Sequence, residues 1–242
     1  MKQEKLIVLP AKGKIVFVGD THGDLEASKK IIGNYLKSNY KIVFLGDYVD
    51  RGYDSKGNID FLLEARKKHP KQVYLLLGNH DAFGIQECYP NDFWESLEER
   101  EKQNYFRIFE NFPLAISAGG IVALHGALPA VEKLEDINKI EDRDKNWMKI
   151  LRGDFAEVKG GILEERPWKR PLFGADYFNE LMNRYNKKVL IRGHQSEAAE
   201  AMFDKKCLTI FTSSAYPRRR IVAIADLEKD IKSIDDLAVE EV

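Results

Sequence analysis

Three apolar runs of the chain each end in glycine, followed by side chains of the kinds that bind metal ions. Residues 15–18 lead into GDTHGD, residues 42–45 into GDYVDRG and residues 73–77 into GNHD. One Gly-Asp step alone is usually only a turn, in which the aspartate bonds to the local backbone. Three such steps in the same setting indicate a shared site, because the ends of neighbouring strands meet at one edge of a sheet.

Histidine strengthens this pattern. Four of the five histidines follow an apolar strand and lie within two residues of a glycine, namely His22, His80, His125 and His194. His69 instead precedes Pro70 at a predicted helix end, where we expect a structural role. Carboxylate, amide and imidazole ligands without thiolate suit Mn²⁺, Fe²⁺/³⁺ or Zn²⁺ and argue against structural zinc. These ligands are too many for one ion. Two ions about 3.5–4 Å apart that share one carboxylate would form a clamp for in-line displacement at phosphorus.

The elements that must position these side chains begin with an alternation of strand and helix. We predict strands at 14–18, 42–45 and 73–77, with helices at 24–36 and 57–68. Asp24 is the expected cap of the first helix. The second ends at His69, since a residue before proline disfavours helical backbone. This order predicts a parallel sheet with right-handed crossovers, which carries the ligand side chains at its carboxyl edge.

The remainder of the chain is predicted to complete one domain over residues 1–242, because no linker or repeat interrupts it. We predict a long helix at 92–112, a hairpin of 114–116 with 121–124, a helix at 176–185 and a strand at 189–191. Alternating apolar residues predict a second, more antiparallel sheet from 201–203, 208–211 and 221–225. The charged segment 132–165 is interpreted as a lid or connection over the site, and residues 227–242 as an acidic tail.

Composition excludes several classes of partner. The chain has 38 Lys and Arg against 39 Asp and Glu, a net charge of -1, so its overall charge favours neither nucleic acid nor an acidic membrane surface. No apolar run approaches the ~20 residues of a membrane span, and the N-terminus lacks a signal-peptide core, so we expect a cytoplasmic protein. Cys88 and Cys207 form no metal or disulfide pattern and are expected to be buried, inert thiols.

Five segments of the chain together give a specific family resemblance. The segments GDTHGD, GDYVDRG, GNHD, LHGALP and IRGHQ, in this order, resemble the motif set of the phosphoprotein phosphatase family of metallophosphoesterases. That family includes the dimetal serine/threonine protein phosphatases, and the match runs from about residue 19 to residue 215. The resemblance implies an α/β protein with a four-layer αββα sandwich of two mixed sheets and a dimetal site at their rim.

The resemblance also implies a ligand set for two divalent ions, with manganese the expected metal and iron or zinc the alternatives. Asp47 would bridge the two ions. One ion would take Asp20, His22 and Asp47, and the other Asp47, Asn79, His125 and His194.

The same resemblance assigns roles beside the metals. His80 matches the general acid, oriented by Asp50, and Arg51 matches a phosphate-binding arginine assisted by Asn79. Tyr216 resembles a tyrosine near the phosphate. A histidine held by a carboxylate can protonate a leaving alkoxide near neutral pH, and a guanidinium fork suits phosphate oxygens. We therefore expect direct attack of a metal-bridging hydroxide without a phosphoenzyme. Asp50 could alternatively be a turn-capping residue.

Some positions depart from the family pattern. Asp81 stands where many relatives have glutamate, a spelling also found in dinucleotide polyphosphate hydrolases of the same fold, and Ala127 replaces the commoner glycine. Arg166 or Arg170 is the best candidate for a second phosphate-binding arginine, with Arg170 preferred. The run 218–220 is interpreted as a solvated strand start, and Trp168 and the aromatic residues of the 92–112 helix as core. Arg192 could touch the rim.

Three functions follow from these residues. The first is hydrolysis of phosphoserine and phosphothreonine in proteins, with a phosphorylated protein or peptide as the partner. The alternative is hydrolysis of dinucleotide polyphosphates such as diadenosine tetraphosphate, or of another small phosphoester. The third is a catalytically inactive fold that serves as a binding scaffold, which would have lost ligands or the Asp50–His80 pair; the chain retains all of them. The oligomeric state is left open.

Overall fold

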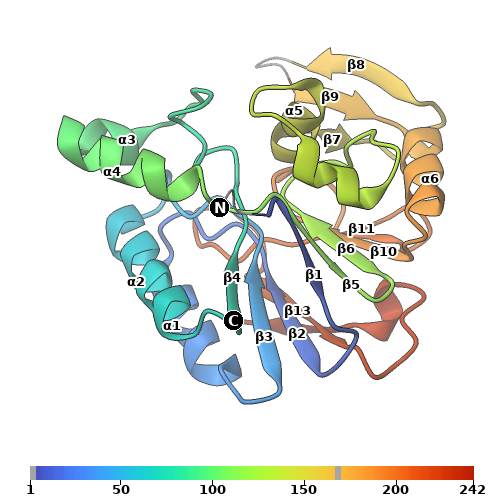
Figure 1. Cartoon of the computed structure of the whole chain (residues 1–242), viewed down its shortest axis with the longest axis horizontal. Helices are drawn as coiled ribbons and strands as arrows, with labels where there is room; N and C mark the ends of the chain where they lie inside the picture. Colours follow the sequence, from blue (N-terminus) through green and yellow to red (C-terminus); the bar gives the residue numbers. More distant parts are fainter. Residues whose placement is uncertain (1–3, 167–169) are drawn as a thin grey trace.

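Two β-sheets packed face to face form the centre of the molecule, seen here in a computed structural model (Figure 1). The structure describes residues 4–166 and 170–242, without the side chains of residues 165 and 166. Over these residues the six-stranded sheet has the order β1 (Leu6–Leu9), β5 (Ala115–Ala118), β6 (Ile121–Leu124), β10 (Val189–Arg192), β12 (Cys207–Thr209), β11 (Ala201–Met202). The five-stranded sheet has the order β14 (Ala238–Glu241), β13 (Ile221–Asp226), β2 (Lys14–Val18), β3 (Tyr40–Phe44), β4 (Val73–Leu75).

Alternation along the strands explains this arrangement. On β2, Ile15 and Phe17 belong to the apolar cluster between the sheets, which Ile191 of β10 joins from the other side. Val16 instead belongs to the outer cluster, with Ile59 of a covering helix. Successive side chains of a strand point to opposite faces, so a strand that is apolar at every position is buried on both.

Helices cover the outer faces of both sheets, which gives the predicted four-layer αββα arrangement. The helices α1 (Leu25–Tyr35) and α2 (Ser55–Lys68) cover the five-stranded sheet (Figure 1). The helices α5 (Lys145–Arg152) and α6 (Ala175–Arg184) lie on the side of the six-stranded sheet. Asp24 caps α1 as predicted, since its Oδ1 accepts a hydrogen bond from the Ala27 backbone N at 3.0 Å. His69 ends α2, also as predicted.

The segment 132–165 contains more regular structure than the sequence indicates. After the 3₁₀ helix η1 (Leu134–Lys139) and α5, it supplies two strands of a small third sheet, in the order β7 (Asp154–Phe155), β9 (Arg170–Phe173), β8 (Ile162–Arg166). A lid role for this segment stays a prediction, as does the single-domain organisation of the chain.

The registers of the parallel strands align their carboxyl ends. Val18 of β2 pairs with Phe44 of β3, and Phe44 pairs with Leu75 of β4. In the other sheet β10 runs parallel to both β6 and β12. An isolated bridge between Asp20 and Phe211 then joins the ends of the two sheets. The polar residues after all these strands therefore meet at one edge of the sandwich.

Two of the predicted elements are wrong. The helix at 92–112 is two helices, α3 (Asp92–Ser96) and α4 (Glu99–Phe109), because Leu97 is extended at ψ 146° and Glu98 starts a new capping box. The three alternating stretches do not share a sheet. The strands β11 and β12 extend the six-stranded sheet, with β12 parallel to β10, whereas β13 is antiparallel to β2 in the five-stranded sheet.

The sequence reasoning also missed the edges of both sheets. The strand β1 pairs parallel with β5, and the acidic tail contains the 3₁₀ helix η3 (Ile234–Asp236) and the strand β14, antiparallel to β13. All four side chains of β14 are exposed, so it has no apolar pattern to reveal it. The interpretation of Trp168 lies outside the described residues.

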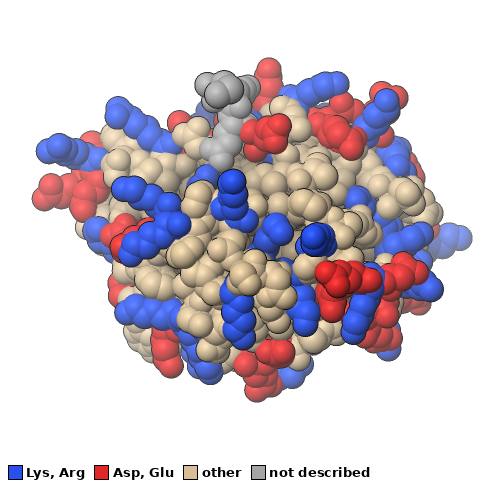
Figure 2. All heavy atoms as spheres, turned by 60° about the horizontal axis from the view of Figure 1, so that its bottom comes forward, with Lys and Arg blue, Asp and Glu red and all other residues tan. Residues whose placement is uncertain are grey.

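The surface agrees with the balanced composition. Figure 2 shows the end of the molecule drawn at the bottom of Figure 1, where basic and acidic side chains are both scattered around the edge. Within the described part of the chain, every helix is too short or too polar to cross a bilayer.

Candidate dinuclear metal centre

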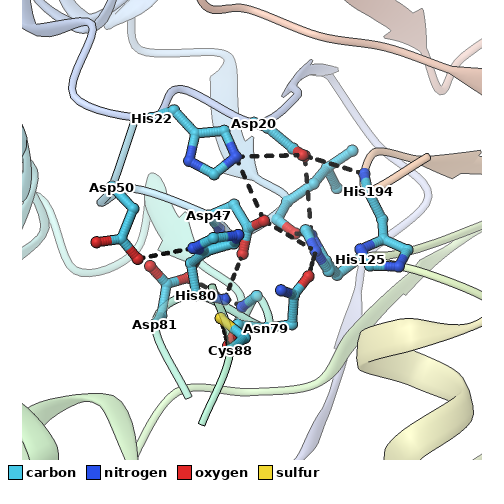
Figure 3. A network of polar contacts seen from close by, with 12 residues as sticks. Asp20, His22, Asp47, Asp50, Asn79, His80, Asp81, Cys88, His125 and His194 are labelled. Atoms are coloured by element: carbon cyan, nitrogen blue, oxygen red, sulfur yellow. Dashed lines mark hydrogen bonds and ion pairs between the residues drawn. The ribbon is translucent and has the colours of Figure 1, made fainter. Parts of the chain in front are cut away.

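The predicted metal ligands lie together at the edge where the carboxyl ends of both sheets meet (Figure 3). None of the six is more than 9% exposed. They are Asp20 and His22 after β2, Asp47 after β3, Asn79 after β4, His125 after β6 and His194 after β10. Two groups of possible ligand atoms, each within 4.8 Å of one another, share Asp47. One group adds His22 and His80, and the other His125 and His194.

The backbone turns sharply to present these side chains. Five residues of the site adopt left-handed backbone: φ is 38° at His22, 55° at Asp47, 66° at Asp50, 70° at Arg51 and 67° at His194. Non-glycine residues adopt this conformation rarely and at a cost of about 1–3 kcal/mol each. Such strain persists where packing and hydrogen bonds hold the chain, and it is concentrated at functional sites.

The Asp47 carboxylate lies at the centre of the cluster. Its Oδ2 is 3.5 Å from His22 Nε2 and 3.4 Å from His125 Nε2. Its Oδ1 accepts a hydrogen bond from the backbone N of His80 at 2.9 Å. An oxygen with an imidazole nitrogen from each sheet at these distances is suited to bridge two cations.

The buried nitrogens test whether this donor set fits metal ions. His22 Nδ1 lies 2.7 Å from the carbonyl oxygen of Val49, which can only accept, so Nδ1 carries the proton and Nε2 presents its lone pair. This Nε2 is buried and has no hydrogen-bond partner among the described residues. A buried lone pair without a partner is unfavourable, whereas a cation beside it would supply one. The site therefore fits a metal ion next to His22.

The second half of the site gives the same result. His125 Nδ1 lies 3.0 Å from the carbonyl oxygen of Leu45, which again places the proton on Nδ1. His125 Nε2 then faces two acceptors, Asn79 Oδ1 at 3.0 Å and Asp47 Oδ2 at 3.4 Å. Three acceptors directed at one another need either an extra proton or a cation between them.

The pKa shifts within the cluster agree with this conclusion. Burial, with the nearby charge of Asp47, raises the pKa of Asp20 to about 7, although His125 opposes the shift. Burial would lower the pKa of His125, but the charges of Asp47 and Asp20 outweigh it and raise that pKa to about 9. The cluster thus concentrates negative charge, which protons offset when no cation is bound.

Asp20 is held at the junction of the two sheets. Its Oδ1 and Oδ2 both lie 3.2 Å from the backbone N of His194, which donates to them. The residue before His194 must be glycine, because a Cβ at position 193 would lie 2.0 Å from Asp20 Oδ1. This close approach brings the ligands of the two sheets together.

His80 and Asp50 form the predicted pair. His80 Nδ1 lies 2.7 Å from Asp50 Oδ2, and Asp50 Oδ1 accepts a hydrogen bond from the Phe93 backbone N at 2.9 Å. Asp50 therefore orients the imidazole and also holds the first turn of α3. The two roles considered from the sequence, orienting His80 and capping a turn, thus occur together. The carbonyl of His80 accepts from Trp94 Nε1 at 2.9 Å. Burial raises the pKa of Asp50 to about 8 and lowers that of His80 to about 4, because it disfavours a charge on either group.

A cavity of about 100 Å³, here called the central cavity, opens onto the cluster. Three arginines among the described residues line it, and two of them are the predicted Arg51 and Arg170. Arg51 donates a hydrogen bond to the hydroxyl of Tyr216, whose ring lies 5.5 Å from that of His22. Arg170 Nη2 lies 2.9 Å from the buried carboxylate of Asp154. The described lining is Asp47, Arg51, Asn79, His80, Cys88, Tyr89, Arg152, Arg170, His194 and Ser196.

The structural roles of several residues in this region were not predicted from the sequence. Asp81 accepts hydrogen bonds from the backbone N atoms of Asp47, Tyr48 and Gly78 at 2.7–2.9 Å, so it holds the loops after β3 and β4 together. Its place in GNHD was a signal for this role. Arg152 and Asp154 had no such signal, because they lie in the segment 132–165 and reach the site only through the tertiary fold.

Other candidates lie outside the central cavity. Arg192 is fully buried, where its Nη1 donates to Gln195 Oε1 at 3.0 Å, so it supports the rim from below. The arginines of the run 218–220 bond to the Ser196 carbonyl and to acidic residues, in agreement with their interpretation as a strand start. Cys88 and Cys207 are both buried, and burial raises the pKa of each thiol to about 12. The side chain of Arg166 lies outside the described residues.

Comparisons with known proteins agree with this geometry. The calcineurin-like phosphoesterase family model matches residues 13–197. A protein serine/threonine phosphatase from Saccharomyces cerevisiae, described as similar to human phosphatase PP5, is a structural match with a TM-score of 0.80 and 22% identity. The match covers 98% of this chain and 83% of that one.

Two further solved structures share the fold at lower similarity. A putative diadenosine tetraphosphatase has a TM-score of 0.58 and 18% identity, over 92% of this chain and 93% of that one. A cold-active protein-tyrosine phosphatase from a psychrophilic Shewanella species has a TM-score of 0.59 and 16% identity, over 99% and 83% of the two chains.

The chain belongs to the calcineurin-like phosphoesterase family, because the family model covers most of its length. It is a phosphoester hydrolase of the metallophosphoesterase type, whose histidine and aspartate clusters can bind a dinuclear metal site. The expected fold and the expected resemblance are thus confirmed.

Proposed function

We propose that this protein is a dimetal phosphomonoesterase that hydrolyses phosphoserine and phosphothreonine in proteins. The observation that carries the proposal is the convergence, on one small cavity, of the Asp47 cluster, the His80–Asp50 pair and the guanidinium groups of Arg51 and Arg170. This set contains what hydrolysis of a phosphomonoester dianion requires: charge neutralisation, an oriented acid and phosphate ligands.

In this proposal Asp20, His22 and Asp47 would hold one divalent ion, and Asp47, Asn79, His125 and His194 would hold the other. The Nε2 of His22, which has no hydrogen-bond partner in the part of the chain that the structure describes, supports the assignment, as do the facing acceptors of His125 and Asn79. Manganese is the proposed metal, with iron or zinc as the alternatives, because a donor set of oxygen and imidazole nitrogen without thiolate suits all three. When bound, two such ions supply a water of lowered pKa and neutralise charge on the phosphoryl group.

The remaining residues act on the substrate itself. Arg51 and Arg170 bind the phosphoryl oxygens, with Asn79 beside them, and the Tyr216 hydroxyl positions the Arg51 guanidinium. His80 donates the proton of its Nε2 to the leaving oxygen. Asp50, whose pKa burial raises to about 8, orients the imidazole and supplies a proton to Nδ1. No residue of the protein needs to form a bond to phosphorus, so the reaction proceeds by direct attack of water.

The size of the central cavity supports a phosphorylated side chain as the substrate. Sites for whole small molecules usually measure about 300–1,000 Å³. The central cavity is about 100 Å³, which suits a phosphoryl group on a serine or threonine that projects from a polypeptide. The similarity to a yeast serine/threonine phosphatase is consistent with this choice.

One observation favours a second candidate, hydrolysis of dinucleotide polyphosphates. Asp81 gives the GNHD spelling that resembles those hydrolases, and a putative diadenosine tetraphosphatase shares the fold. The test is a comparison of kcat/KM on a phosphothreonine peptide and on diadenosine tetraphosphate, with manganese-loaded protein of measured metal content. Faster cleavage of the peptide supports the first proposal, and faster cleavage of the tetraphosphate replaces it with the second. Failure to hydrolyse either compound or p-nitrophenyl phosphate would favour the scaffold hypothesis.

A further inference from the structure

A second cavity, of about 400 Å³, lies beside the central cavity. It is formed by the loop after β4, the helix α5 and the strands β8 and β9. Its described lining is Gln86, Arg143, Lys145, Met148, Lys149, Ile162, Glu164, Pro171 and Phe173. None of these residues takes part in the proposed chemistry.

Three connections make this cavity a neighbour of the site. Arg152 lines the central cavity, and Lys149, one turn earlier on α5, lines the second. Arg170 lines the central cavity, and the next residue, Pro171, lines the second. Arg152 Nη2 also donates to the carbonyl of Glu87 at 2.7 Å, which ties the loop after β4 to α5 between the two cavities.

A third cavity, of about 470 Å³, continues the second along the same loop. The two share Gln86 and Arg143 in their linings. Among the described residues the third adds Phe83, Gly84, Ile85, Glu87 and Phe106. The second and third cavities together are called the basic groove below. A groove that begins next to a phosphate site and extends along a loop can hold several residues of an extended polypeptide.

The groove combines positive charge with apolar surface. Over the described lining of both cavities, Arg143, Lys145 and Lys149 are three cations against two acids, Glu87 and Glu164, and the two lysines and Glu164 lie in the second cavity. Ile162 is 72% exposed there, although it is a large apolar residue. On a chain with a net charge of -1, this local excess of positive charge is a feature of the groove and not of the whole surface. Figure 2 likewise shows both signs of charge around the opposite end of the molecule.

The aromatic residues of the groove argue against a nucleobase as its occupant. Phe173 is stacked on Tyr177 with ring centroids 4.1 Å apart, and Lys149 Nζ lies 5.9 Å from the Phe173 centroid. Phe83 and Phe106 are both stacked on Trp94, at 5.3 Å and 4.9 Å. Binding of a base normally uses an aromatic face that is open for stacking. Phe173 is buried, and Trp94 already occupies one face of the half-buried rings of Phe83 and Phe106.

We infer that the basic groove binds an acidic, partly apolar segment of the substrate polypeptide, next to its phosphorylated residue. Acidic side chains of the segment pair with Arg143, Lys145 and Lys149, and its apolar side chains contact Met148 and Ile162. The inference rests on the proposed function, because it assumes that the phosphate in the central cavity belongs to a protein. It names the sequence context that the enzyme selects.

The test compares two phosphothreonine peptides that differ only in whether the flanking residues are aspartate and glutamate or lysine. We expect kcat/KM to be about tenfold higher for the acidic peptide, as a few partly exposed ion pairs would give. The double variant Arg143→Glu/Lys145→Glu should reduce this preference below about twofold, with the rate on p-nitrophenyl phosphate unchanged. The matched control is Lys29→Glu/Lys30→Glu, which makes the same change in charge at exposed positions of α1. It should retain the preference.

A second measurement separates this inference from the proposed function. An unphosphorylated acidic peptide should inhibit hydrolysis of p-nitrophenyl phosphate by the wild-type protein, and should inhibit the Arg143→Glu/Lys145→Glu variant much less. Inhibition of this kind by a protein that hydrolyses no phosphopeptide would support the groove and reject the proposed function. Equal kcat/KM for the two phosphopeptides, or a preference that survives the charge reversal, would overturn the groove and leave the proposed function in place.

Discussion

The central cavity and the basic groove are neighbours, yet they are built in different ways. The cluster around Asp47 is at most 9% exposed, and its loops are cross-linked by hydrogen bonds such as those of Asp81. The groove has exposed cations, Arg143 and Lys145, on the segment between β6 and β7. Bond breaking requires fixed positions within a fraction of an ångström, whereas selection of a charged partner requires only a local potential.

The arginines and lysines of the two regions show the same difference. Arg51 is fixed by Tyr216, and Arg170 by the buried Asp154, so each guanidinium has a defined position at the central cavity. Lys145 is exposed at the start of α5, where solvent and salt screen its charge. Substitutions should therefore have large, specific effects in the central cavity and small, salt-dependent effects in the groove.

The largest effect is expected from Asp47→Asn. The amide cannot bridge two cations as a carboxylate does, so metal content and activity should fall together, with a rate loss of about 10³-fold or more. Metal analysis of the purified variant and its rate on p-nitrophenyl phosphate measure the two quantities. Undiminished metal content would contradict the bridging role of Asp47.

The next largest effect is expected from His80→Asn. Loss of a general acid should reduce turnover of a phosphothreonine peptide by about 10²–10⁴-fold, because its leaving alkoxide needs a proton. The loss should be much smaller for p-nitrophenyl phosphate, whose leaving group is stable as an anion, and both metals should remain bound. An equal loss on both substrates would reject the acid role of His80.

Arg170→Ala should have an intermediate effect, which sharpens the contrast with the groove. Removal of one charge-assisted phosphate ligand is expected to lower kcat/KM by about 10–100-fold on every phosphomonoester, whatever its flanking sequence. Arg107→Ala, at an exposed position of α4, is the matched control and should have wild-type activity. A loss confined to peptides would instead assign Arg170 to the groove.

The contrast also explains what the sequence could predict. The ligands follow buried strands, where a run of apolar residues and a terminal glycine reveal both the strand and the edge to which it points. His125 and His194 come from the other sheet. Their place after apolar strands already grouped them with the site, and the family resemblance assigned them to the ion that shares Asp47. Resemblance and strand pattern together thus predicted the ligand cluster.

The remaining features depend on contacts that no local pattern encodes. Exposed edge strands such as β14 carry acidic side chains and no apolar face, so they resemble a tail. The break at Leu97 divides a region whose aromatic residues, taken from the sequence alone, fit one continuous helix. The groove lies where α5 meets the loop after β4, and there Arg152 donates a hydrogen bond to the carbonyl of Glu87, a residue 65 positions earlier in the chain.

The smallest expected effect is that of salt on the groove, and it is the most direct way to separate the two regions. Raising the ionic strength from about 0.05 M to about 0.5 M shortens the Debye length from more than about 10 Å to well below 8 Å, so exposed pairs with Lys145 weaken. The preference for an acidic over a basic phosphopeptide should fall several-fold, to about twofold. The ratio of wild-type to His80→Asn turnover on one peptide should stay constant with salt. The reason is that His80 and Asp50 are buried and lie within hydrogen-bond distance of each other. If the preference for acidic peptides is insensitive to salt, selection must occur inside the buried central cavity, and the division of labour between the two regions would be wrong.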